Sequence, residues 1–213
     1  MKRVATIILN RNLPEPTEKL YEHIYKNEAK LTDIFVVEAG SDKDRISKYC
    51  TWHVTEDDVL VKGLRYCRGM NYALLELSKN KNFEKYDAFF LLTNDTILPQ
   101  KYTINKLLEI LDNHKQLGII SPCSEKWGEK QLLLKEKTKY FWFIHNNALM
   151  LKKEFVEEIS IKQNPSYFNF VFDGNNFRGF LSESELIAKA YANNWAAGVT
   201  SNVYAEENES YLL

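Results

Sequence analysis

The feature that most restricts the fold is a series of short, continuous apolar runs, within which polar and apolar residues do not alternate. Strands that are buried on both faces have this pattern, because helices cover both sides of their sheet. The runs are Val4–Leu9, Ile34–Val37, Ala88–Leu92, Ile119–Ile120, Phe141–Ile144 and Ala148–Leu151. They predict a largely parallel or mixed sheet.

Segments with helical spacing separate these runs. Thr17 is placed to cap one helix that carries Leu20 and Ile24, and a late helix is expected over Glu183–Asn193. Further helical stripes are Met70–Leu77 and the set Ile104, Leu107, Leu108 and Leu111. The alternation of strand and helix predicts an α/β fold. We expect a single domain over residues 1–213, a length that can bury a sizeable core.

Charge and cysteine usage exclude several classes of protein. The chain has 28 Lys and Arg against 29 Asp and Glu, so it lacks the strong positive field of a dedicated nucleic-acid binder. The chain has an odd number of cysteines, and no two of them have C-x-x-C spacing, which indicates reduced thiols; they are Cys50, Cys67 and Cys123. No apolar segment is long enough for a signal peptide or a membrane span. We therefore expect a cytoplasmic protein without a transmembrane segment.

Motif searching excludes some common chemistries. The turn after the first run, Asn10–Pro14, contains no glycine, so the G-x-G-x-x-G pyrophosphate turn is absent there. The sequence also lacks a P-loop, a G-x-S-x-G elbow and an H-E-x-x-H helix.

Polar side chains instead follow the ends of the predicted strands. They occur at Asn10–Asn12, Glu38–Asp42 and Thr93–Thr96, while Ser182–Glu185 opens the late helix and Gly63–Asn71 lies between. Ligands of parallel sheets bind at the carboxyl ends of the strands. We therefore expect these segments to meet at one crevice.

These segments resemble the inverting glycosyltransferase family 2. The resemblance is carried by LLTNDTILP at Leu91–Pro99, GLRYCRGMN at Gly63–Asn71, DIFVVEAGSD from Asp33, and FRGFLSESELIAKAYANNW ending at Trp195. It implies a GT-A-like fold, in which helices flank a Rossmann-type mixed, mostly parallel sheet. It also implies transfer of a sugar from a nucleoside-diphosphate-sugar donor to an acceptor hydroxyl, assisted by Mn²⁺ or Mg²⁺.

The resemblance implies a role for each matched polar residue. Asp95 corresponds to the metal ligand, and a carboxylate at a strand end suits a hard cation that also holds phosphate oxygens. The nucleotide side comprises Asn12, Glu38, Arg65, Asn71, Thr93 and Asn94. The alternatives stay open: Asp95 in a capped turn, Glu38 as a solvated turn residue, and Asn12 as a loop or capping residue.

On the acceptor side, Glu183 corresponds to the general base that deprotonates the attacking hydroxyl. Glu185 and Asn146 correspond to the acceptor or donor-sugar pocket. The alternative is that Glu183 and Glu185 are first-turn acids that the helix dipole favours.

The chain departs from the family pattern at two places. Thr93 and Asp95 stand where related proteins have two carboxylates, and no histidine follows Trp195 to serve as a further metal ligand. Glu206 or Glu207 is a candidate substitute.

The leading hypothesis is thus a metal-dependent inverting glycosyltransferase of polysaccharide or glycan biosynthesis, with its nucleotide side in about residues 1–100 and its acceptor side in about 101–213. Its expected partners are the donor and a glycan or other hydroxyl acceptor, without nucleic acid, and peripheral membrane contact is compatible with this role. A catalytically degenerate nucleotide-sugar-binding module and, ranked last, a nucleotidyltransferase are the competing hypotheses.

Overall fold

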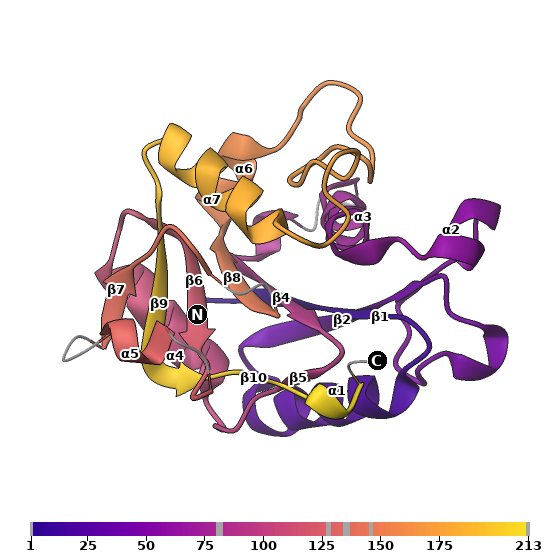
Figure 1. The fold of residues 1–213 in the computed structure, drawn as a ribbon, viewed down its shortest axis with the longest axis horizontal. Helices are drawn as coiled ribbons and strands as arrows, with labels where there is room; N and C mark the ends of the chain where they lie inside the picture. The colour runs from indigo at the N-terminus through magenta and orange to yellow at the C-terminus, as the bar shows by residue number, and fades with distance from the viewer. Residues whose placement is uncertain (1, 80–82, 127–128, 134–136, 145–146, 212–213) are drawn as a thin grey trace.

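The computed structural model describes residues 2–79, 83–126, 129–133, 137–144 and 147–211. At its centre, these residues form an eight-stranded sheet in the order β3-β2-β1-β4-β8-β6-β9-β7 (Figure 1). The strands β3, β2, β1 and β4 are parallel, whereas β8 runs antiparallel to both β4 and β6. At the far edge, β9 is parallel to β6 and antiparallel to β7. The predicted α/β class and the mixed sheet are therefore confirmed.

The strands are β1 (Val4–Asn10), β2 (Thr32–Ala39), β3 (Trp52–Val54), β4 (Ala88–Thr93), β5 (Thr96–Ile97), β6 (Leu117–Cys123), β7 (Thr138–Tyr140), β8 (Ala148–Lys152), β9 (Ala196–Tyr204) and β10 (Glu206–Glu207). The α-helices are α1 (Pro14–Glu28), α2 (Asp57–Lys62), α3 (Arg65–Lys79), α4 (Thr103–Asn113), α5 (Glu129–Leu133), α6 (Lys153–Ile159) and α7 (Ser182–Ala192). Short 3₁₀ helices are η1 (Lys43–Arg45), η2 (Phe83–Lys85) and η3 (Glu209–Tyr211).

Helices cover both faces of the sheet, which explains why its strands are continuously apolar. Along β1, Ala5 and Ile7 pack in one core with α3, α6 and α7, while Val4 and Ile8 pack in a second core with α1 and α4. Figure 1 shows these two helix layers above and below the sheet. Successive side chains of a strand point to opposite faces, so each apolar run supplies both cores.

Two details differ from the sequence prediction. The run Phe141–Ile144 is not a strand: β7 ends at Tyr140, and the Trp142 side chain is 78% exposed. Its aromatic residues therefore lie partly in solvent, where an apolar pattern does not indicate burial. Thr17 does not cap α1, because that helix begins at Pro14 and the Thr17 hydroxyl donates to the Leu13 carbonyl at 2.8 Å.

The cysteines are reduced, as the sequence predicted. Cys50, Cys67 and Cys123 are free thiols. Burial raises the pKa of the Cys67 thiol to about 12, so this cysteine is not a nucleophile at neutral pH. Among the residues described, no helix combines the length and the apolar character that crossing a membrane requires.

Candidate active site

The carboxyl ends of β1, β2 and β4 meet at one edge of the sheet, and Asn10 joins them. In the strand register, Asn10 lies opposite Glu38. The Asn10 amide donates to both Glu38 oxygens at 3.0 and 2.8 Å, and its own oxygen accepts from Asn94 Nδ2 at 2.8 Å. This side chain therefore fixes the Glu38 carboxylate relative to the turn that carries Asp95. The sequence indicated Asn10 only as the first residue of the polar segment Asn10–Asn12 and predicted no separate role for it, although its position directly after an apolar run was a usable signal.

Glu38 is fully buried beneath this edge. Besides Asn10, the Ser41 hydroxyl donates to its carboxylate at 2.5 Å and the Ser47 amide at 2.9 Å. Protein donors thus surround both oxygens, and a ligand would have to displace one of them to bind this carboxylate. The expected contact of Glu38 with the nucleotide stays a prediction.

Asn12 joins the loops that follow β1 and β2. It has a left-handed φ of 60°, its amide donates to Ser41 Oγ at 3.1 Å, and its side chain exchanges two hydrogen bonds with Asp42. Asparagine tolerates this backbone conformation better than most residues. Asn12 therefore lies at the predicted edge and holds the two loops together.

A compact turn after β4 positions Asp95. The Thr93 hydroxyl donates to the Asp95 carboxylate and also lies 3.2 Å from the Thr96 hydroxyl. The short strand β10 pairs with β5 directly after this turn, and the Asn208 amide donates to the Asp95 carbonyl at 2.8 Å. The C-terminal segment is thereby fastened to the turn that carries the predicted metal ligand.

The β5–β10 pairing distinguishes Glu206 from Glu207, the two carboxylates that the sequence offered as a further metal ligand. Glu207 lies opposite Thr96 in the ladder and lines the same crevice as Asp95. Glu206 instead accepts hydrogen bonds from the Ser124 hydroxyl at 2.6 Å and the Glu125 amide at 2.8 Å. The described residues contain no group of three or more His, Cys, Asp or Glu side chains arranged to hold a metal. Asp95 and Glu207 nevertheless offer hard oxygen ligands, which suit Mg²⁺ or Mn²⁺ when phosphate oxygens and waters complete the shell.

The crevice itself has a volume of about 880 Å³. Its lining residues are Lys62, Arg65, Tyr66, Asp95, Arg178, Gly179, Phe180 and Glu207. Carboxylates from β10 and the β4–β5 turn thus share one space with cations from the α2–α3 junction and from the segment before α7. A smaller cavity of about 260 Å³ lies on the α1 side of the turn, is lined by both polar and apolar residues and also reaches Asp95.

Two left-handed residues build the α2–α3 junction. Gly63 ends α2 with φ 68°, and a Cβ at this position would lie 2.7 Å from Arg11 Nη1. The Arg11 guanidinium in turn donates to the carbonyls of Leu60 and Val61. Arg65 follows with φ 60°, a conformation that costs free energy in a residue with a side chain. This junction directs the exposed side chains of Lys62 and Arg65 into the crevice lining.

Tyr66 begins the wall behind these cations. Its side chain is 6% exposed, and its buried hydroxyl has no hydrogen-bond partner among the residues described. Burial raises the pKa of Tyr66 well above its ordinary value, and the charges of Cys67 and Glu183 add to this effect. Glu183, in the first turn of α7, is therefore close to a residue that lines the crevice. The Glu183 side chain is 9% exposed, and the Ser182 hydroxyl lies 3.4 Å from its carboxylate.

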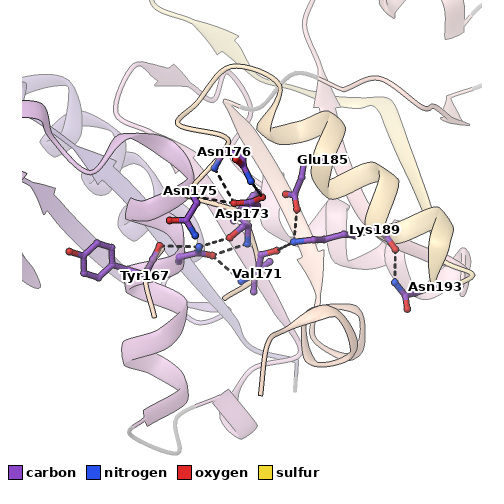
Figure 2. A network of polar contacts seen from close by, with 10 residues as sticks. Tyr167, Val171, Asp173, Asn175, Asn176, Glu185, Lys189 and Asn193 are labelled. Carbon is purple, nitrogen blue, oxygen red and sulfur yellow. Dashed lines mark hydrogen bonds and ion pairs between the residues drawn. The ribbon is translucent and has the colours of Figure 1, made fainter. Parts of the chain in front are cut away.

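Glu185 lies in a different environment (Figure 2). It forms an ion pair with Lys189 at 2.5 Å, and the Lys189 ammonium also donates to the Val171 carbonyl at 2.7 Å. Burial raises the pKa of Glu185, while Lys189 opposes that rise. This residue therefore joins α7 to the segment that precedes it, and its expected place in a sugar pocket stays a prediction.

Asn71 fastens the same irregular segment to α3. It is fully buried, it donates to the carbonyls of Tyr167 and Phe172, and it accepts from the amides of Val171 and Phe172. All the hydrogen-bonding groups of its side chain are thus used within the chain. The nucleotide contact expected of Asn71 is untested, and Asn146 lies outside the described residues.

The arrangement can be compared with known proteins. No protein-family model and no curated protein matches the chain. Among solved structures, GalNAc-T7 with UDP, GalNAc and Mn²⁺ superposes with a TM-score of 0.71 at 8% identity, covering 97% of this chain and 44% of that one. The mannosyltransferase PcManGT from Pyrobaculum calidifontis, in complex with GDP-Man and Mn²⁺, gives 0.66 at 16% identity, with 93% and 54% covered.

A third structure, TarS of S. aureus, gives a TM-score of 0.65 at 12% identity, covering 95% of this chain and 36% of that one. This chain therefore spans about half, or less, of the length of these three proteins. The likeness confirms the GT-A fold that the sequence resemblance implied. At these identities it shows the fold alone.

Proposed function

We propose that this chain is a metal-assisted glycosyltransferase. It takes a sugar from a nucleoside-diphosphate donor to an acceptor hydroxyl with inversion, in the biosynthesis of a polysaccharide or related glycan. The proposal is carried by the crevice in which Asp95 and Glu207 share one space with Lys62 and Arg65. A bound diphosphate and its cation need both charge types close together. Two of the structural neighbours were solved with a nucleotide or nucleotide sugar and Mn²⁺, which supports this choice of ligand.

We assign the donor to the strand-end side, in about residues 1–100, and the acceptor to about residues 101–213. Asp95 and Glu207 would hold Mn²⁺ or Mg²⁺, which when bound neutralises the diphosphate as it leaves. Lys62 and Arg65 are placed to bind phosphate oxygens. Asn94 and Asn12 border the nucleotide side, while Glu38 and Thr93 hold the edge and the turn in shape.

Glu183 is assigned as the general base. In the transfer, a bond forms between the acceptor oxygen and the anomeric carbon while the bond from that carbon to the diphosphate oxygen breaks. The acceptor proton passes to the Glu183 carboxylate, and the electron pair leaves with the nucleoside diphosphate. The attack comes from the face opposite the leaving group, so the configuration inverts. Low exposure removes competing water from this carboxylate and suits the role.

One observation favours a binding module without turnover. Thr93 occupies the place of a second carboxylate and hydrogen bonds to Asp95, so metal binding depends on Glu207 as the other acid. Donor hydrolysis in the presence of Mn²⁺ distinguishes the two functions, because a binding module releases no free sugar. No observation favours a nucleotidyltransferase.

The central experiment measures binding of UDP, GDP, ADP and CDP by calorimetry with and without Mn²⁺. We expect Asp95→Asn and Glu207→Gln each to remove most of the Mn²⁺-dependent affinity of the nucleotide that binds. The matched control is Glu209→Gln, which removes a surface carboxylate that pairs only with Lys126 at 3.2 Å among the described residues. Unchanged Mn²⁺ dependence in both crevice variants would refute the metal site.

A further inference from the structure

The cations of the crevice come from two separate parts of the chain. Lys62 and Arg65 lie at the α2–α3 junction, whereas Arg178 lies on the segment that leads into α7. Lys62 and Arg65 are the cations that would bind the phosphate oxygens of a nucleoside diphosphate held at Asp95. The chain therefore supplies an additional guanidinium beside the helix that carries Glu183.

Arg178 is not neutralised by its own chain in the part described. Its exposed side chain forms no hydrogen bond or ion pair there. Burial of Arg68 is the largest cause that lowers the pKa of its guanidinium, and the positive charge of nearby Arg178 is the next. Two neighbouring guanidiniums repel each other, and an anion bound at Arg178 would relieve that repulsion.

Two acidic residues near Arg178 in the sequence, Asp173 and Glu185, are engaged elsewhere. Asp173 accepts from the amides of Asn175 and Asn176 and from the Asn176 side chain, and Glu185 pairs with Lys189 (Figure 2). Neither carboxylate forms an ion pair with Arg178, so its guanidinium is available to an anion from outside the chain.

Phe180 lies two residues further on and lines the same crevice. Its side chain is 88% exposed, which is unusual for a phenylalanine. The next residue, Leu181, has a left-handed φ of 62°, a strained conformation that proteins retain mostly at functional sites. The segment therefore presents an unpaired guanidinium and an open aromatic face immediately before the first turn of α7.

Tyr66 also lines the crevice. Its hydroxyl is buried and has no hydrogen-bond partner in the described structure, which is costly for a polar group.

We infer that the acceptor is an acidic sugar, whose carboxylate or phosphate group binds Arg178 while its ring packs on Phe180. The inference rests on the proposed transferase function and specifies its acceptor. Because Arg178, Phe180 and Glu183 occupy one short stretch of chain, the residues that recognise the acceptor also fix its hydroxyl relative to the base.

The test uses three probes that differ in charge: glucose, glucuronic acid and glucose 6-phosphate. Their binding is measured by calorimetry to the full chain with Mn²⁺ and the nucleoside diphosphate already bound. The variants are Arg178→Gln, Phe180→Ala and Phe180→Tyr. Arg45→Gln, an exposed arginine on η1 outside the crevice lining, is the charge control.

We expect the wild type to bind at least one acidic probe about tenfold or more tightly than glucose, since a hydrogen bond to a charged group has that effect. Arg178→Gln removes this preference and leaves nucleotide affinity unchanged. Phe180→Ala weakens the acidic probes and glucose by a similar factor, whereas Phe180→Tyr and Arg45→Gln preserve binding. Preference for glucuronic acid or for glucose 6-phosphate identifies the anionic group.

Three results would each overturn the inference. The first is that the wild type shows no preference for either acidic probe, which includes the case in which no sugar binds. The second is that Arg178→Gln keeps the same preference, and the third is that Arg178→Gln loses nucleotide affinity. The last would assign Arg178 to the donor. The proposed transferase function fails separately, at the preceding step, if no nucleoside diphosphate binds with Mn²⁺.

Discussion

The two sides of the crevice are built in opposite ways. At the strand ends, Asn10, Ser41 and Ser47 satisfy the buried Glu38 carboxylate from within the chain. Before α7, Arg178 has no such partner in the described structure, and Phe180 is largely exposed. One side is therefore a rigid support whose polar groups bind each other, while the other side keeps its binding groups available for a ligand.

The largest effect is expected at Glu183, the proposed general base. Glu183→Gln should lower kcat by about 10²–10⁴-fold with unchanged donor affinity, because general-base catalysis acts mainly in the transition state. The measurement is steady-state transfer together with nucleotide titration. Glu185→Gln is the matched control, since Glu185 pairs with Lys189. Full loss in Glu185→Gln with normal turnover in Glu183→Gln would show that the sequence match is shifted by two residues.

The next prediction tests the rigid side. Asn10→Ala should lower the free energy of unfolding by about 3 kcal/mol, because it removes two of the four hydrogen bonds to the buried Glu38 carboxylate and the acceptor of the Asn94 amide. Urea denaturation measures this change.

Two controls make that comparison specific. Asn12→Ala, at a half-buried loop position, should cost less, and Phe180→Ser should remain within about 0.5 kcal/mol of the wild type. The contrast between the two sides is wrong if Phe180→Ser destabilises the chain as much as Asn10→Ala.

The smallest effect concerns pH. Burial raises the pKa of Glu185 in the folded state despite Lys189, so its contribution to stability is present below the ordinary pKa of a glutamic acid and is lost as pH rises through the folded value. Glu185→Gln stays neutral, so its stability relative to the wild type should increase between about pH 4 and pH 7.

Denaturation at both pH values measures this trend. Glu15→Gln should give the opposite trend, because a hydrogen bond from Lys19 lowers the pKa of Glu15. If Glu185→Gln loses stability relative to the wild type as the pH rises, the ion pair outweighs burial.

Much of the rigid side could be predicted from the sequence. Continuous apolar runs indicated β1, β2 and β4, and the polar residues directly after them had to reach the same edge of a parallel sheet. The role of Asn10 is a matter of side-chain geometry, which spacing does not specify. Between Glu206 and Glu207, the choice depends on the register of two paired residues.

The proposed acceptor side was harder to predict for a physical reason. Residues 160–181 contain no regular helix or strand, so no periodicity indicates which side chains point into the crevice. Long-range bonds from Asn71 hold this segment, and their partners lie about a hundred residues away in the chain. Arg178 and Phe180 were therefore found only from the structure.

The pairing of β10 with β5 has a consequence for how the site forms. Asp95 and Glu207 are separated by more than a hundred residues, and a ladder of only two residues on each strand brings them together. Closing a loop of this length costs conformational entropy, and a ladder of two residues contributes few hydrogen bonds to offset that cost. The β5–β10 pairing is therefore expected to be among the last contacts to form and the first to open. A cation that binds both carboxylates would hold the C-terminal segment against the β4–β5 turn. Ligand occupancy would then slow amide exchange at Asn208 while the central sheet, already closed, remains unaffected.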